Sequence, residues 1–201
     1  MKRIFGLMFI VTLCSMLNAV GGRLAFGMDT FGELYTINAA LRIGQVDPMA
    51  PTVSIQVMQQ IKNLSLGAGA DYHFNRNANL PEGFESVWGK HSFLPIYGSF
   101  AYNIPTYGSL KPQLIAKLGH SFPKFSFPFN DEDEKYSSSG GAFYGAGIGL
   151  DYRQSSLQVM YQTHEMKVKN SEYYDGSWED DYENFMVARQ LNISLGFKFG
   201  N

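Results

Sequence analysis

The chain of 201 residues has one cysteine, few charged residues and, after Val20, no apolar run of 18 or more residues. A single cysteine excludes a disulfide framework and a cysteine-based metal site, and the missing apolar run argues against a transmembrane helix there. Charged residues make up 17%, below the ~25% typical of soluble domains. The 16 Lys and Arg against 18 Asp and Glu leave no basic excess for binding nucleic acid, and 15% aromatic residues argue against disorder.

What the sequence has in quantity is glycine and aromatic residues. It contains 21 Gly, 16 Phe and 12 Tyr. Aromatic side chains favour strands, and glycine is frequent where strands turn tightly or pack closely. Together with the scarcity of charge, this composition predicts an all-β protein.

The first residues have the organisation of a secretory signal peptide. Lys2 and Arg3 form a positively charged segment, an apolar stretch follows over residues 4–17, and Ala19 offers a small residue for cleavage before Val20. The apolar stretch is shorter than the about 20 residues that a spanning helix needs. We therefore predict a cleaved signal peptide over residues 1–19.

The remaining chain, residues 20–201, is predicted to be one exported domain. Cleavage removes Cys14, so the mature protein has no thiol. Lipidation at Cys14 is the alternative. It is disfavoured because the bulky Leu13 precedes the cysteine where lipidation sites usually carry a small residue.

Period-two alternation of apolar and polar residues recurs after Val20 and predicts strands. The last segment is the clearest, because Leu191, Phe199 and every second residue between them are apolar, with Arg189 the exception on that face. Arg189 lies ten residues before Phe199, roughly 25 Å along a tilted strand, which is the height of an outer-membrane apolar band. An arginine there reaches the lipid headgroups. Eight such segments occur, at about residues 23–29, 53–58, 64–74, 96–104, 113–122, 141–153, 157–164 and 186–199.

The two faces of these segments favour a membrane barrel over a soluble sandwich. One face is aromatic and aliphatic, whereas the other carries glycine, glutamine, asparagine and isolated charges. A solvated sheet face normally carries Thr, Lys and Glu, so the second face is a poor protein surface. Inside a narrow barrel, small residues fit and amides and charges form hydrogen bonds, while the apolar face contacts lipid. The sequence therefore predicts a transmembrane up-and-down antiparallel β-barrel.

Connection lengths support the barrel independently. Short links alternate with long polar ones, so that all the long links lie at one end of an up-and-down barrel, as in outer-membrane barrels with short periplasmic turns. Residues 31–44 leave the strand count open, because they could extend the first strand, add strands to give ten, or form a surface helix. We expect eight strands. The short links are near residues 60–63, 105–111 and 153–156, and the long ones near 31–50, 75–91, 123–140 and 167–184.

A family resemblance accompanies these patterns. The blocks that carry it combine glycines and aromatics with a short turn, and the chain resembles the outer-membrane protein β-barrel domain family, which includes relatives of outer-membrane protein A and the opacity-type surface proteins. These blocks are residues 94–102 with 110–114, and residues 145–152 with 157–161. The resemblance implies a small barrel of about eight strands and no single biochemical activity.

The chain end is similar to the assembly signal of such barrels, an alternating strand that closes on an aromatic residue. Leu195, Phe197 and Phe199 form this pattern, and the resemblance implies recognition by the barrel-assembly machinery. The aromatic residue is not terminal here, because Gly200 and Asn201 follow it.

A sparse set of charged residues is predicted to line the lumen. They form either the wall of a conducting or binding channel or a plug of paired groups, and an eight-stranded barrel favours the plug because its interior is just wide enough for side chains. Lone buried charges are costly, so we expect Lys117 to pair with Asp29 or Asp71, and the charges near the periplasmic end to neutralise one another. The predicted lumen residues are Arg23, Asp29, Asp71, His73, Lys117, Asp151, Arg153, His164 and Lys198.

The histidines raise the question of an enzyme, because some small barrels resemble lipid A deacylases, palmitoyltransferases or surface proteases. His120 and Ser121 are neighbours and therefore lie on opposite faces of a strand, which prevents a direct pair. An Asp71–His73 pair is open but no motif supports it. We predict no enzyme, and assign no catalytic residue, cofactor or metal ligand.

Two long links are acidic and aromatic. They either contact a host or envelope ligand, or collect divalent cations together with lipopolysaccharide, or form a solvated acidic rim, which is the interpretation we favour. No EF-hand spacing is present. Trp178 is the best single candidate for adhesion. The loop candidates are Asp131, Glu132, Asp133, Glu134, Tyr174, Trp178, Asp180 and Asp181.

The sequence thus predicts a monomeric barrel of the cell outer membrane with a structural or surface-exposed role. Its expected partners are outer-membrane lipid, lipopolysaccharide and the barrel-assembly machinery, and no nucleic acid. Two alternatives remain open: a narrow porin-like channel for small solutes, and a lipid-modifying enzyme.

Overall fold

The computed structural model describes residues 20–36, 41–46, 49–76, 78–79, 90–126, 134–174 and 177–200. Within these ranges every regular element is a strand, and no helix is long and apolar enough to cross a membrane. The strands are β1 (Val20–Thr36), β2 (Leu41–Val46), β3 (Ala50–Ile61), β4 (Leu64–Arg76), β5 (Ala78–Asn79), β6 (Lys90–Asn103), β7 (Leu110–Ser126), β8 (Glu134–Tyr152), β9 (Ser155–Tyr174) and β10 (Ser177–Phe199).

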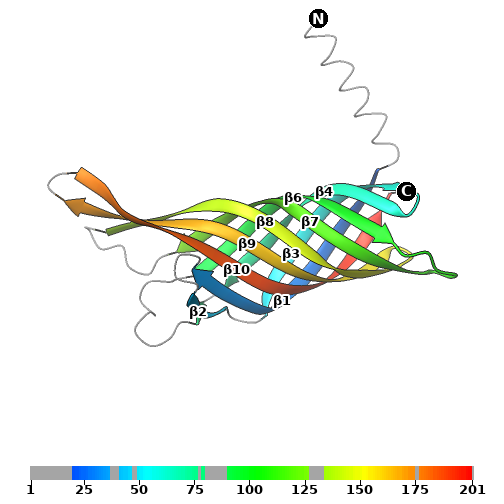
Figure 1. Cartoon of the computed structure of the whole chain (residues 1–201). Helices are drawn as coiled ribbons and strands as arrows, with labels where there is room; N and C mark the ends of the chain where they lie inside the picture. Colours follow the sequence, from blue (N-terminus) through cyan, green and yellow to red (C-terminus); the bar gives the residue numbers. More distant parts are fainter. Residues whose placement is uncertain are drawn as a thin grey trace, which may run out of the picture.

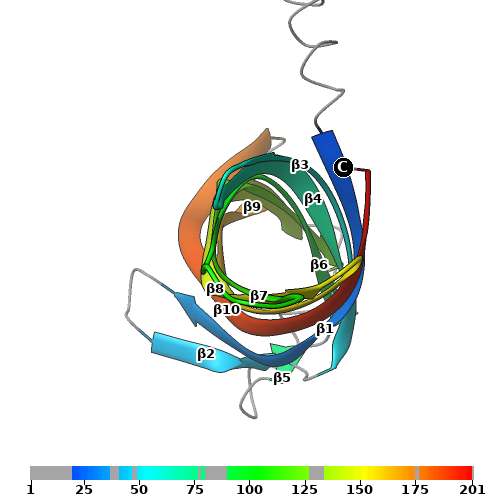
Figure 2. The ribbon, with the colours of Figure 1, turned by 90° about the vertical axis from the view of Figure 1, so that its right-hand side faces the viewer.

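Eight of these strands form a closed antiparallel barrel. The order around the barrel is β1, β3, β4, β6, β7, β8, β9 and β10, and β10 returns to pair with β1 from Gly22↔Phe199 to Thr36↔Met186. The view along the barrel shows the complete ring (Figure 2). The predicted fold class and strand number are therefore confirmed.

The two remaining strands lie outside the ring and answer the question about residues 31–44. β1 pairs with β3 only up to Asp29, and beyond a bulge between Asp29 and Phe31 it pairs with β2 through Glu33↔Gln45 and Thr36↔Leu41. β5 adds to β2, and both lie beside the ring (Figure 2). The described residues thus form ten strands, of which eight make the barrel. β2 and β5 stay outside it because β1 pairs with β3 before the bulge and with β2 after it.

The ends of the barrel differ as the connection lengths predicted. β3–β4 and β8–β9 are joined by two-residue turns whose first residues, Lys62 and Arg153, have φ of 56° and 53°. Both chain ends, Val20 and Phe199, lie at this same end (Figure 1). We call it the periplasmic end. The opposite end carries the longer connections.

One predicted long link is instead mostly strand. β9 continues to Tyr174 and β10 begins at Ser177, and the two remain paired through Trp178↔Tyr173. They project beyond the other strands as a hairpin (Figure 1). The expected loop over residues 167–184 was wrong, because β9 and β10 continue their backbone pairing through most of that range.

A belt of exposed apolar side chains surrounds the barrel near the periplasmic end. Its most exposed members include Leu118 (71%), Leu195 (67%), Phe26 (63%) and Ile148 (60%). Exposed apolar patches of this extent are not found on soluble monomers, and they match the lipid-facing band of outer-membrane barrels. The face that the sequence assigned to lipid is the face that the structure exposes.

Candidate functional site

The inward face of the lipid-embedded strands is polar and buried. Eight of the nine residues predicted to line the lumen point into it: Arg23, Asp29, Asp71, His73, Lys117, Asp151 and His164 are at most 5% exposed, and the Lys198 side chain is 30% exposed. Arg153 does not line the lumen. The strand ends at Tyr152, so Arg153 falls in the turn, where it is exposed and its guanidinium lies 5.4 Å from the Tyr152 ring centroid.

The centre of the lumen is crossed by an ion pair. Lys117 on β7 places Nζ 2.8 Å from Asp71 Oδ2 on β4, one of the two partners that the sequence suggested. The Tyr97 hydroxyl donates to Asp71 Oδ1 at 2.5 Å and accepts from Gln56 Nε2 at 2.6 Å. Both charged side chains are at most 3% exposed and multiply bonded, and the group links the four consecutive strands β3, β4, β6 and β7.

A second set of bonds lies beside it and links β1, β4, β9 and β10. Asp29 Oδ2 lies 2.9 Å from His73 Nδ1, and Asn192 Nδ2 donates to Asp29 Oδ1 at 2.9 Å. Gln190 Nε2 lies 3.0 Å from His73 Nδ1 and 2.9 Å from His164 Nε2. The sequence left an Asp71–His73 pair open, but His73 is bonded to Asp29 instead, and Asp71 is bonded to Lys117 and Tyr97. We call the bonded residues of these two paragraphs the lumen network.

The lumen network ends in a serine–histidine pair that sequence reasoning missed. Ser121 Oγ lies 2.9 Å from His164 Nδ1, whereas His120 faces outward, as strand alternation requires. The pair joins β7 to β9 across β8, and its register depends on a bulge between Gly140 and Phe143. No local motif signals such a contact, because it is set by the stagger of three strands.

Chemically, this pair has the elements of a nucleophile and a base but not their accessibility. Ser121 and His164 are both 0% exposed. The ring of Phe93 stacks on His164 at 4.5 Å between centroids, and that of Phe143 lies at 5.0 Å. A general base must reach a substrate proton, and these rings cover the imidazole. The absence of an enzyme nevertheless stays a prediction.

Above the lumen network, at the end far from the termini, the interior becomes apolar. Its members come from β1, β6, β9 and β10, and the outward neighbours on β9 and β10 are charged, such as Lys167 and Arg189. The sequence did not predict this change. We call the cluster the apolar cap; it consists of Leu34, Phe93, Met166, Val168, Met186 and Ala188.

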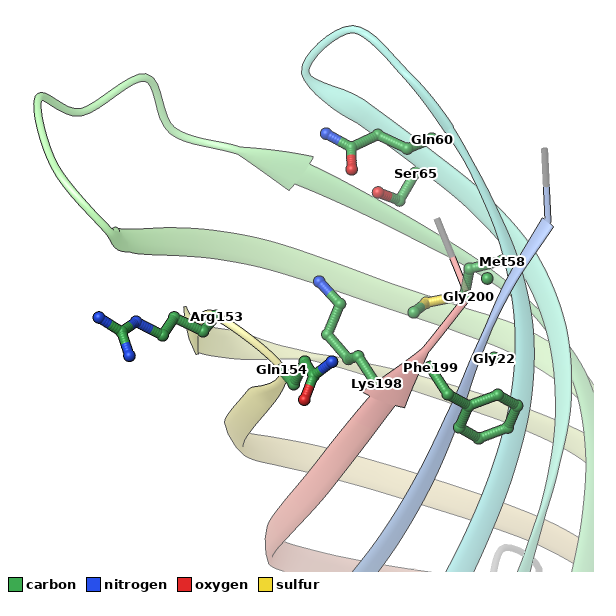
Figure 3. Close-up of a pocket in the computed structure, with 10 residues that line it drawn as sticks. Gly22, Met58, Gln60, Ser65, Arg153, Gln154, Lys198, Phe199 and Gly200 are labelled. Carbon is green, nitrogen blue, oxygen red and sulfur yellow. The ribbon is translucent and has the colours of Figure 1, made fainter.

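At the periplasmic end the lumen opens into a mouth. Lys198 Nζ lies 2.5 Å from Asp151 Oδ2, and Gln113 Nε2 donates to the same oxygen at 2.7 Å. The mouth holds a cavity of about 170 Å³, which Lys198 and, at its rim, the exposed turn residue Arg153 border (Figure 3). Deeper in the lumen, a second cavity of about 20 Å³ is bordered by Arg23 and Gln158.

The loop candidates whose backbone is described lie at the opposite end. Asp131, Glu132 and Asp133 fall outside the described residues. The backbone of Glu134 belongs to β8, that of Tyr174 to β9, and those of Trp178, Asp180 and Asp181 to β10. Among the residues whose side chains are described, no group of three or more His, Cys, Asp or Glu is arranged to hold a metal ion.

The residues of the predicted assembly signal face lipid. Leu195 is 67% exposed, Phe197 52% and Phe199 50%, all on the outer face of β10. Their strand closes the barrel against β1.

Comparisons with known proteins support the fold. No protein-family model matches the chain, and no curated protein matches it. It is similar in structure to the outer membrane protein OprG of Pseudomonas aeruginosa, with a TM-score of 0.62, 11% identity, and coverage of 90% of this chain and 96% of that one. Neisserial surface protein A gives a TM-score of 0.53 with 13% identity over 90% and 97% of the two chains. The outer membrane protein AlkL gives 0.52 with 11% identity over 90% and 91%.

These structures are small outer-membrane β-barrels, and the chain has their fold. The resemblance to outer-membrane barrels is therefore confirmed at the level of architecture. At such identities the likeness concerns the fold alone, since one barrel architecture carries many functions.

Proposed function

We propose that the protein is a monomeric barrel of the outer membrane whose lumen is plugged and whose role is structural and surface-exposed. The observation that carries this proposal is the lumen network. Lys117–Asp71 joins β7 to β4 and Asp29–His73 joins β1 to β4, in each case across one intervening strand, and Gln190 carries the bonding on from His73 to β10. The inner cavity beside these bonds measures about 20 Å³, a space for about one water molecule.

The apolar cap supports the plug from the other side. Leu34, Met186 and Phe93 are at most 1% exposed, and they close the interior between the lumen network and the far end. Polar solutes would have to break packed apolar contacts as well as buried ion pairs. The lumen network and the apolar cap close the lumen at two successive levels, one by polar bonds and one by apolar packing. Together they favour a permanently closed lumen over a channel.

The surface role is inferred from the far end. The β9–β10 hairpin carries Trp178, Asp180 and Asp181 beyond the barrel wall, where we expect a solvated acidic rim against lipopolysaccharide or an envelope ligand. The outward Phe197 and Phe199 are expected to contact lipid and the assembly machinery. An enzymatic role is not part of the proposal, because the Ser121–His164 pair is covered.

Single-channel recording in planar bilayers tests the plug. The refolded mature protein is expected to give no steady openings, with heat-modifiable gel migration serving as the check that the barrel is folded. The Lys117→Ala variant removes the central cation and is expected to give at most brief openings, because the apolar cap is intact. Steady openings of the wild-type protein whose size or selectivity changes in Lys117→Ala would make the protein a channel and overturn the proposal.

A further inference from the structure

We propose that the periplasmic half of the lumen contains a binding site for a small monovalent anion of halide size, centred on the Arg23 guanidinium. The site goes beyond the proposed structural role. It is built from buried side chains that the lumen network does not use. Arg23 is its cation, Ser156 and Ser194 fix that cation in place, and Gln158 borders the same inner cavity.

The guanidinium is held in a defined position. Arg23 Nε donates to Ser156 Oγ at 2.7 Å and Nη2 donates to Ser194 Oγ at 3.3 Å. Gly196 lies against it, and a Cβ at that position would be 2.6 Å from Arg23 Nε. Two serines and a glycine thus form a cradle that leaves the third nitrogen for another partner.

That third nitrogen is buried without a partner. Arg23 is 1% exposed, and its Nη1 makes no hydrogen bond. Gln158 Oε1 is likewise buried and unbonded, and both residues border the same cavity of about 20 Å³. Since the two ends of a glutamine amide are alike in shape, a rotation of that amide presents its NH₂ to an anion. A cavity of this size accommodates one water-sized species.

The charge balance selects an anion for this place. Three charged groups border the inner cavity: Arg23, Lys198 and Asp151. Asp151 is already bonded to Lys198 at 2.5 Å, and the next lumen carboxylate, Asp71, is paired with Lys117 at 2.8 Å. Asp29 lies six residues further along β1, which is about 20 Å of strand. Arg23 therefore has no hydrogen-bonded carboxylate, and Asp71 and Asp151, which act on it electrostatically, are each already paired with a lysine. An anion beside Nη1 would supply the direct counter-charge that a buried cation requires.

A route to the site leads from the periplasmic mouth. The mouth cavity and the inner cavity share Met58, Ser65 and Lys198 as lining residues. Figure 3 shows the Lys198 side chain at the mouth. Its ammonium is paired with Asp151, so Arg23 is the cation that attracts an anion along this route. Chloride fits this description by charge and size, whereas sulfate and phosphate exceed the inner cavity.

Chloride NMR line broadening tests the proposal on the folded mature protein in detergent. The wild-type protein is expected to broaden the chloride line, and bromide is expected to compete while sulfate at equal ionic strength is not. Arg23→Met, which keeps the length but not the charge, is expected to lose the broadening. Arg189→Met removes an exposed arginine that borders neither cavity and is the matched control, expected to behave as wild type.

Two further measurements test the proposal even if the Arg23→Met variant does not fold. Gly196→Ala leaves every charge in place but displaces the guanidinium from its cradle, so it is expected to weaken chloride broadening even if Arg23→Met does not fold. A crystal of the wild-type protein grown in bromide is expected to show an anomalous peak beside Arg23 Nη1. Broadening that persists unchanged in folded Arg23→Met, or a bromide crystal with only a water peak at Nη1, would overturn the proposal.

Discussion

The lipid-embedded part of the barrel and its far part follow opposite rules along the same strands. On β10, Leu195 faces outward and Ser194 inward, whereas nearer the far end Arg189 faces outward and Met186 inward. On β9, Tyr161 is exposed and Gln162 is buried. Nearer the far end of the same strand, the half-buried Lys167 faces outward and the buried Met166 faces inward. Every second residue stays inward along both strands, although the outward Thr163 and Val187 are also buried between the two parts. What changes is the medium around the barrel, from lipid to water. Apolar residues face outward in lipid, whereas charged residues face outward and apolar ones inward in water.

This difference teaches that the two parts hold their interiors by different forces. In the lipid-embedded part the lipid offers no hydrophobic gain for burying apolar side chains, so the interior is fixed by ion pairs and hydrogen bonds. In the far part water surrounds the strands, and the apolar cap packs as the core of a soluble barrel does. The predictions below distinguish these two forces, beginning with the largest expected effect.

Removing the central cation should destabilise the protein most. Lys117→Met leaves Asp71 buried without its partner, and the expected loss is about 3–5 kcal/mol in the free energy of unfolding. Urea unfolding of the refolded protein measures it. The double variant Lys117→Met/Asp71→Asn removes both charges and should recover much of that loss; a double variant as unstable as the single one would show that the ion pair is not the cause.

Truncation in the apolar cap should have the next largest effect. Met186 is 0% exposed, and Met186→Ala leaves a cavity expected to cost about 2–5 kcal/mol. The same urea experiment applies. Met186→Leu, which nearly conserves the volume, should cost much less. If alanine and leucine had equal small effects, the far part would not be held by packing.

A charge on the lipid face should be harmful only at depth. Ile148 lies in the middle of the outward run on β8, and Ile148→Lys is expected to cost about 2–4 kcal/mol. Ala142 is outward on the same strand but further from the periplasmic end, so Ala142→Lys should cost about 0–1 kcal/mol. Unfolding in lipid vesicles compares the two; equal costs would place both residues at one depth and shift the proposed membrane boundary.

The smallest effect is expected at Arg189, the residue of β10 where the outward face changes from apolar to charged. Arg189 is exposed, and its guanidinium lies 5.1 Å from the Tyr35 ring centroid. Arg189→Ala should change the free energy of unfolding by about 0.5 kcal/mol or less, because an exposed cation–π contact is weak. Arg189→Glu should be similarly mild in neutral detergent. A large loss would mean that Arg189 is buried in the lipid and not at its edge.

Much of the architecture follows from the sequence because period-two alternation is local. The outward Leu191–Phe199 pattern, the short turns and the eight-stranded count needed only neighbouring residues. The same reasoning placed Lys117 and Asp71 in one lumen. It could not choose between Asp71 and Asp29 as the partner of Lys117, because that choice depends on how far neighbouring strands are shifted along one another around the barrel. Likewise, Ser121 meets His164 only through the bulge at Gly140, and no neighbouring residue indicates it.

Two errors have a common physical origin. Arg153 was assigned to the lumen because alternation was extended one residue past Tyr152, into a turn where backbone direction no longer alternates. Residues 167–184 were assigned to a loop because their polarity was judged as if lipid still surrounded them. In both places the alternation rule of lipid-embedded strands was applied to residues outside such strands: a turn in one case and the far part of the barrel in the other.

The pairing of β1 with β10 has a consequence for how the protein is made. Strands from the two ends of the chain meet along fourteen registered pairs, from Gly22↔Phe199 to Thr36↔Met186. The bond from Asn192 to Asp29 also joins residues 163 positions apart. Contacts of such sequence separation form late in folding, after the loop they enclose has been ordered. The ion pairs Lys117–Asp71 and Asp29–His73 lie on β1, β4 and β7, whereas the bonds from Asn192 and Gln190 form only when β10 arrives. Closure of the wall by the last strand thus also completes the hydrogen bonding of the interior.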